Sequence, residues 1–338
     1  MASACLRWGA GSLGLVGQEI AHDRNGMFSV LRKYGALAGV AVAAAFVVSA
    51  PRAGAEASPM LPDLRQAPVG CLGGYDGNPV KCDDWDVCMV AEATAPRGQC
   101  LKSGPAKAVR IRFTSAADNI GDGPLLLFGR RDSVDEPTMR VRQAFQSGVD
   151  GPIPDAYAAA QRATTAFAYY EPAQSHEHWH LMGFERFELR TPAGEPLATD
   201  RKNGFCLGDR YPTYDVGRLT YTPEDGTPAG RVADLLDGNM CGHHNPDALD
   251  VVEGISVGSG DDYRYKVDFQ WLDITHIPSG VYDLVHTVNP DRTLLEKDYA
   301  NNSSSVSISI RWRDDVGPLT VPPRVDFLRS CPGQARCS

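Results

Sequence analysis

Residues 176–189 read HEHWHLMGFERFEL, and within them three histidines recur at every second position. Side chains of a β-strand point alternately to its two faces. In an extended strand, His176, His178 and His180 therefore share one face, and Trp179 lies on the other. Three imidazoles on one face form a ligand set that suits copper(II) or zinc. The stretch predicts a strand that carries a metal site, with a plain row of surface histidines as the alternative.

The sequence around this stretch is also typical of strands. Short apolar runs, several with period two, are separated by Gly, Pro, Asp and Asn, the residues of turns. Only one segment, Pro154–Ala166, is rich enough in Ala to suggest a helix, and a loop is its alternative. Two long connections, 132–150 and 220–253, are the kind of loop that carries function. The predicted strands are Ala108–Phe113, His178–Leu189, Tyr265–Ile274, Val281–Val288 and Val306–Trp312.

The sequence therefore predicts a mainly β protein, a single β-sandwich domain with long loop insertions and a small Cys-rich N-terminal subregion. The expected parts are an N-terminal extension with a signal peptide (1–55), the Cys-rich part (56–105), the β domain (106–315) and a C-terminal tail (316–338).

The N-terminus has the order of a secretory signal. A basic lead-in at 27–33 precedes an apolar run at 35–50, and small residues follow at 53–55, so we expect cleavage after Ala55 and a secreted protein. The apolar run is shorter than the roughly 20 residues of a membrane span. A retained membrane anchor is the alternative, and stable membrane association after cleavage is not expected.

The cysteines agree with export. Eight follow the signal, and an even number in an exported segment indicates disulfides. Four lie between Cys71 and Cys100, where three pairings or a zinc site remain open. The natural remaining pairs are Cys206–Cys241 and Cys331–Cys337.

The charge balance argues against nucleic acid as a partner. The whole chain has a formal charge of −9, and without residues 1–55 the remaining 28 basic and 40 acidic side chains give −12. Such a surface repels phosphates and steers cations towards the protein.

Four ordered segments carry a resemblance to a known family. They are residues 176–189, Lys202–Leu207, Gly254–Thr275 and Gly280–Asn302. Together they resemble the lysyl oxidases, in a match that extends over roughly residues 60–315.

The resemblance implies a protein-lysine 6-oxidase-like enzyme, in which copper is held by the three histidines. Lys202 and Tyr263 would crosslink into lysine tyrosylquinone. The implied reaction oxidises primary amines, such as lysine or peptidyl-lysine, to aldehydes with dioxygen, releasing ammonia and hydrogen peroxide. Asp268 is a candidate catalytic base, and a salt-bridged or turn-forming Asp268 is its alternative.

A second metal site is predicted near the end of the matched region. Glu296, Asp298, Asn301 and Asn302 supply four oxygen donors within seven residues, which suits calcium. The resemblance adds Asp63 and the Leu64 carbonyl to this set. A polar turn that caps a hairpin is the alternative.

Two other functions remain open from the sequence. His178, His180, Glu185 and His286 loosely resemble the iron or manganese ligands of cupins, although the second half departs from the cupin spacing. A non-catalytic secreted metal-binding module that kept the fold and the histidine strand is the third possibility.

Overall fold

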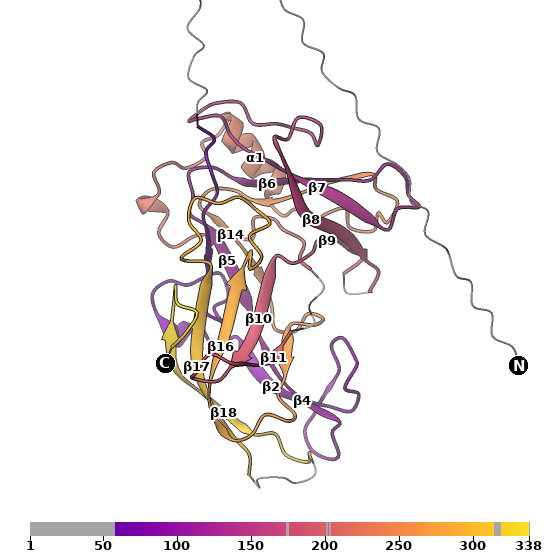
Figure 1. Cartoon of the computed structure of the whole chain (residues 1–338), viewed down its shortest axis with the longest axis vertical. Helices are drawn as coiled ribbons and strands as arrows, with labels where there is room; N and C mark the ends of the chain where they lie inside the picture. Colours follow the sequence, from indigo (N-terminus) through magenta and orange to yellow (C-terminus); the bar gives the residue numbers. More distant parts are fainter. Residues whose placement is uncertain (1–57, 174–175, 201, 203, 314–318, 338) are drawn as a thin grey trace, which may run out of the picture. The chain divides into compact units, whose positions relative to one another are not determined.

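The computed structural model divides the chain into two units, residues 1–54 and 55–338. It describes residues 58–338 except 174–175, 201, 203, 314–318 and 338 (Figure 1). The predicted signal peptide lies outside these described residues. Within them, no helix has the length and apolar character needed to cross a membrane.

The described elements are mostly strands, so the prediction of a mainly β protein is confirmed. They are β1 Leu64–Gln66, β2 Trp85–Val90, β3 Cys100–Leu101, β4 Ala108–Phe113, β5 Ser115–Asn119, β6 Leu125–Arg130, β7 Thr138–Ala144, β8 Arg162–Glu171, β9 His178–Leu181, β10 Glu185–Arg190, β11 Pro196–Thr199, β12 Tyr211–Pro212, β13 Asp250–Ile255, β14 Ser259–Tyr263, β15 Trp271–Asp273, β16 Gly280–Val288, β17 Ser303–Arg311 and β18 Arg324–Cys331, with the α-helix α1 Pro228–Leu236 and the 3-10 turns Pro79–Lys81 and Val216–Arg218.

The strands form four sheets in which every strand pair is antiparallel. Their orders are β1-β5-β14-β12, β11-β10-β16-β17-β18, β13-β6-β7-β8-β9 and β15-β4-β2-β3. Figure 1 shows β10, β16 and β17 running side by side in the second sheet. The histidine strand β9 is at one end of the third sheet, so one of its edges is left for irregular segments to cover.

Aromatic contacts join the second and fourth sheets face to face. Phe113 of β4 meets Phe187 of β10 edge to face at 5.0 Å between ring centroids, and Trp85 of β2 stacks on Phe327 of β18 at 4.2 Å. Edge-to-face and offset-stacked rings stabilise a core beyond their buried area. The two sheets thereby form the layers of the predicted sandwich.

The single predicted helix is wrong, and the observed one lies elsewhere. Residues 154–161 form turns and loop, and β8 begins at Arg162 because it pairs with both β7 and β9. Tertiary pairing here overrides the helix propensity of alanine. The helix α1 instead lies within the connection 220–253, where the Thr227 side chain accepts the Gly230 N–H and Pro228 occupies the first turn.

Two predicted strands are interrupted. The run 178–189 divides into β9 and β10 at a turn that contains Gly183, whose φ is +72°. The run 265–274 is a strand only over β15, and residues 265–269 form turns. The other three predicted strands are found as β4, β16 and β17.

Four disulfides bind the described part of the chain. Cys206–Cys241 and Cys331–Cys337 are paired as predicted, and the open pairings resolve as Cys71–Cys82 and Cys88–Cys100. The Cys-rich segment is built into the fold, since β2 pairs with β4. The C-terminal segment also carries a strand, β18, which pairs with β17.

Candidate active site

The three histidines of residues 176–180 converge, although only two of them lie on a strand. His178 and His180 belong to β9, whereas His176 precedes it in a turn in which the backbone N–H groups of His176 and Glu177 both point to the Ala173 carbonyl. Glu177 has φ +50°, so the backbone is not extended there. One ring nitrogen from each histidine nevertheless lies within 4.8 Å of those of the other two.

The electrostatics of these rings suit metal binding. Burial is the main cause that lowers the pKa of His176 to about 4 and that of His178 to about 3. Both rings are therefore neutral at neutral pH, with lone pairs free to bind a metal. The buried Nδ1 atoms of His176 and His178 have no hydrogen-bond partner among the described residues. Two neutral imidazoles with unused nitrogens, beside the ring of His180, fit a copper or zinc ion.

The segment that contains Lys202 covers the free edge of β9. Phe205 exchanges two backbone hydrogen bonds with Leu181, of 2.7 and 3.1 Å, directly after His180. Gly204 makes this approach possible, because a Cβ there would lie only 2.8 Å from the His180 Cβ, and its φ is +107°. The Asp200 carboxylate adds a second anchor by accepting the backbone N–H groups of Lys202 and Phe187.

Lys202 and Tyr263 meet on this segment. The Lys202 Nζ lies 4.8 Å from the centroid of the Tyr263 ring and 4.9 Å from that of Phe205. The Tyr263 ring packs edge to face on Phe205, with the centroids 4.9 Å apart. Two residues that are 61 positions apart in the sequence are thus brought together beside the histidine strand.

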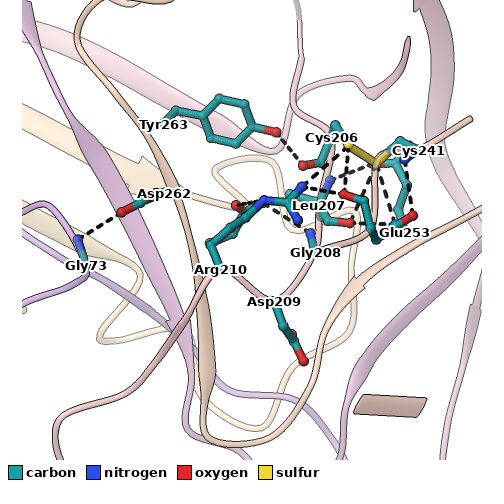
Figure 2. Close-up of polar contacts among 12 residues, drawn as sticks. Gly73, Cys206, Leu207, Gly208, Asp209, Arg210, Cys241, Glu253, Asp262 and Tyr263 are labelled. Atoms are coloured by element: carbon teal, nitrogen blue, oxygen red, sulfur yellow. Dashed lines mark hydrogen bonds and ion pairs between the residues drawn. A yellow bond between two sulfur atoms is a disulfide. The ribbon is translucent and has the colours of Figure 1, made fainter. Parts of the chain in front are cut away.

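The surroundings of Tyr263 are shown in Figure 2. Its hydroxyl points to the Cys206 carbonyl, to which it donates a hydrogen bond, next to the Cys206–Cys241 disulfide. Burial, with a further contribution from Asp261, raises the pKa of Tyr263 well above its usual value. The phenol is therefore protonated at neutral pH and held in one orientation.

Burial also makes the amine of Lys202 easier to deprotonate. It lowers the pKa of this lysine to about 8, against 10.5 for an ordinary lysine. A neutral amine has the lone pair that nucleophilic addition needs.

Asp268 lies on the turn between β14 and β15 and is buried. Its carboxylate oxygen Oδ1 accepts the Arg97 Nε–H at 3.1 Å, and its backbone carbonyl accepts the Lys202 Nζ at 3.5 Å. The predicted base is therefore close to the lysine, and it is also held in an ion pair, which was its alternative role. Arg97 lies in the Cys88–Cys100 loop, so the Cys-rich segment contributes to this site.

The residues of the predicted calcium site also gather. Glu296 Oε2 accepts the Leu64 N–H at 2.8 Å, and the Asn301 amide donates to Asp63 Oδ1 at 2.7 Å. The buried side-chain oxygens of Asn301 and Asn302 have no hydrogen-bond partner among the described residues. Burial raises the pKa of Glu296 to about 7, so a nearby cation would stabilise the ionised carboxylate. Unused amide oxygens beside carboxylates fit calcium.

The four residues of the cupin-like set divide into two groups. His178 and His180 converge with His176, while Glu185 Oε2 pairs with His286 Nε2 at 3.2 Å across β10 and β16. No observation among the described residues favours a cupin-like centre.

Part of the sequence is similar to known proteins. The lysyl oxidase family model matches residues 236–316. Lysyl oxidase homolog 3 of Homo sapiens is 30% identical over 131 residues, which cover 38% of this chain and 14% of the human protein. Lysyl oxidase homolog 2 of Gallus gallus is 30% identical over 128 residues, covering 38% of this chain and 13% of the chicken protein. Over residues 236–316 the chain is therefore similar to the lysyl oxidase family.

Lysyl oxidase homolog 2A of Danio rerio is a third relative, 27% identical over 130 residues and matched over 14% of its length. The alignments with these three relatives span only 13–14% of the length of each. The family model includes Tyr263, Asp268 and the Glu296–Asn302 donors, whereas the histidines and Lys202 precede the matched range.

Some residues near this candidate site were not predicted from the sequence. Arg97 is one, and Glu177, His243 and His244 form another group in which three ligand atoms lie within 4.8 Å of one another. The adjacent pair His243-His244 was the available signal, but a pair of neighbouring histidines alone does not indicate a third partner.

Proposed function

We propose that this chain is a secreted copper-dependent amine oxidase of the lysyl oxidase family that builds lysine tyrosylquinone from Lys202 and Tyr263. One primary amine, one dioxygen and one water would give one aldehyde, one ammonia and one hydrogen peroxide. The observation that carries the proposal is the 4.8 Å separation between the Lys202 Nζ and the Tyr263 ring centroid. The four disulfides favour export to an oxidising exterior.

The chain's own residues have distinct tasks in this proposal. His176, His178 and His180 would hold copper, and Phe205 keeps the Lys202 segment against β9. When bound, copper and dioxygen supply the oxidising chemistry that turns a phenol into a quinone, and the quinone serves as the electron sink for amine oxidation. Tyr263 presents a fixed ring, oriented by its hydrogen bond to the Cys206 carbonyl.

Lys202 is the nucleophile of cofactor formation. Its amine is over the ring, and the pKa of about 8 leaves an appreciable neutral fraction at neutral pH. The new bond would join Nζ to a ring carbon of the oxidised tyrosine, with the amine proton and the ring proton at that carbon passing to water or to a nearby base. This addition leaves the ring reduced by two electrons, and a further dioxygen would reoxidise it to the quinone and leave as hydrogen peroxide.

Asp268 is proposed as the base that removes a proton from the carbon beside the substrate nitrogen. Support comes from its contact with Lys202 through the backbone carbonyl and from Arg97, which fixes the carboxylate. The preferred substrate is a primary amine such as lysine or peptidyl-lysine, cationic in solution, and the net acidic chain attracts such a cation.

The proposed test compares two lysine–tyrosine pairs. Lys202→Arg and Tyr263→Phe should each abolish the crosslinked peptide, the hydrazine-sensitive quinone absorption and amine-dependent peroxide release. The matched control is the pair Lys266→Arg and Tyr265→Phe, in which a lysine also lies over a tyrosine ring, at 5.1 Å. These controls should keep all three signals. Peroxide release that survives both Lys202→Arg and Tyr263→Phe would show that the proposal is wrong.

A further inference from the structure

A histidine-containing loop lies along the same edge of β9 as the Lys202 segment, because the Trp179 N–H bonds to this loop and the Leu181 N–H bonds to Phe205. The loop follows α1, and the Cys241 carbonyl accepts the Trp179 N–H of β9 at 2.9 Å. The His244 N–H donates to the Glu177 carbonyl at 2.7 Å, and the Asn245 carbonyl accepts the Trp179 indole N–H at 3.1 Å. The Cys206–Cys241 disulfide fixes the start of this loop to the segment that carries Lys202.

Three donor groups converge on the outer surface of this junction. One ligand atom from each of Glu177, His243 and His244 lies within 4.8 Å of the other two. The His244 Nδ1 is 3.4 Å from a Glu177 carboxylate oxygen, and the two imidazole rings lie 3.7 Å apart. Both histidines are exposed, so an ion from solvent can reach them without any rearrangement of the fold.

This group adjoins the triad of His176, His178 and His180 but shares no residue with it. The ring centroids of His243 and His178 are 6.2 Å apart, and Glu177 lies between His176 and His178 in the chain. The peptide that presents the inner histidines therefore also presents the outer carboxylate.

We propose that Glu177, His243 and His244 form a second, solvent-accessible site for a divalent transition metal beside the triad. Two imidazoles and one carboxylate are a donor set that zinc and copper(II) both accept, with a coordination position left for water. The site does not depend on the quinone, because none of its three residues contacts Lys202 or Tyr263 in the described structure.

The test titrates the metal-free full chain with Zn²⁺, which is redox-inert and cannot start quinone formation. Calcium is kept in excess so that oxygen-donor sites are filled, and isothermal titration calorimetry counts the sites. We expect two zinc sites per chain in the wild type and one in the His243→Ala/His244→Ala double variant. Glu177→Gln should weaken the outer site at least tenfold. His276→Ala removes an exposed histidine elsewhere and should leave two sites.

His180→Ala distinguishes the two centres. It removes the inner site, so one zinc ion should remain if the outer site exists, whatever the fate of the proposed oxidase activity. Unchanged stoichiometry in the His243→Ala/His244→Ala variant would overturn the inference and leave a plain Glu177–His244 ion pair. A wild type that binds one zinc ion, lost with His180→Ala, would overturn it as well.

A second measurement detects whether two bound metal ions lie close together. In the anaerobic wild type loaded with two equivalents of Cu²⁺, neighbouring ions should broaden one another's paramagnetic resonance spectrum. The double variant loaded with one equivalent should give a single uncoupled signal. Two equivalents that give only the uncoupled signal plus free copper would contradict the second site.

Discussion

At the scale of single residues, the charge of the Lys202 amine decides when the proposed crosslink can form. With a pKa of about 8, about a tenth of this amine is neutral at pH 7 and about half at pH 8, far more than for a lysine with a pKa of 10.5. Because the neutral form is the nucleophile, quinone formation after copper addition should accelerate with pH and level off above pH 8.

The measurement is the rate at which the quinone absorption grows in metal-free protein that receives copper at pH 6 to 10. The histidine pKa values of about 4 and about 3 keep His176 and His178 neutral throughout this range, so the charge of these two proposed ligands does not vary. A rate that keeps rising tenfold per pH unit up to pH 10 would show that Lys202 titrates as an ordinary exposed lysine.

Arg97 supports a second prediction at this scale. Its Nε–H holds the Asp268 carboxylate at 3.1 Å, and its own side chain is 49% exposed. A half-exposed ion pair of this kind contributes at most about 1 kcal/mol to holding the Asp268 carboxylate in place. Arg97→Gln should therefore lower kcat about fivefold, because the carboxylate loses its orientation, and KM should change little.

The controls for Arg97 separate positioning from folding. Arg97→Lys should recover part of kcat, since it restores a donor at the same place. Arg140→Gln breaks an exposed ion pair with Asp132 far from the site in sequence and should leave kcat unchanged. If Arg97→Gln changes the unfolding temperature but not kcat, its role is structural only.

At the scale of elements, the Cys206–Cys241 disulfide connects the lysine segment to the loop that caps β9. The Cys206 carbonyl orients the Tyr263 hydroxyl, and the Cys241 carbonyl binds the Trp179 N–H. The double variant Cys206→Ser/Cys241→Ser should therefore form the quinone at least tenfold more slowly, because Lys202 and Tyr263 lose a common anchor.

The matched control is Cys331→Ser/Cys337→Ser, which opens the disulfide beside β18. The rate of quinone formation is measured per folded, copper-loaded chain at a temperature below both unfolding transitions. Equal rates in the two double variants would mean that the disulfide next to Tyr263 has no special part in assembly.

Among the elements, sequence patterns predict some strands and miss others. Strands β4, β16 and β17 were predictable because their apolar residues form a recognisable run in the sequence and are also buried in the core. The run at 265–269 also contains apolar residues but forms turns, which place the Asp268 carbonyl next to Lys202. Composition alone does not distinguish an apolar strand from an apolar turn whose contacts come from distant segments.

The candidate site also combines residues that the sequence predicts with residues that it does not. The histidines are local in sequence, and the matched motifs connected Lys202 with Tyr263. Arg97 and Asp268 are 171 positions apart, and no local pattern joins them. His243 reaches Glu177 only because a disulfide and backbone hydrogen bonds bring the loop after α1 to β9.

At the scale of the whole molecule, the predicted calcium site joins the beginning of the folded part to its last strands. Asp63 precedes β1, and Asn301 precedes β17, 238 positions later. An ion that binds both segments only in the folded state stabilises it by about 2.7 kcal/mol at a concentration 100 times its dissociation constant. Removal of calcium should therefore lower the unfolding temperature by roughly 5–10 °C, at 2–4 °C for each kcal/mol.

Asp298→Asn tests whether the loss arises at this site. We expect the variant to unfold at a lower temperature in calcium and to respond less than the wild type to chelation by EGTA. The control Asp291→Asn breaks only an exposed pair with Arg186 and should keep the full calcium response. Because the site shares no residue with the Lys202–Tyr263 pair, copper binding and quinone formation should persist in the folded variant at low temperature. A wild type whose unfolding temperature ignores both calcium and EGTA would mean that hydrogen bonds alone, such as that between Leu64 and Glu296, hold these two ends of the chain together.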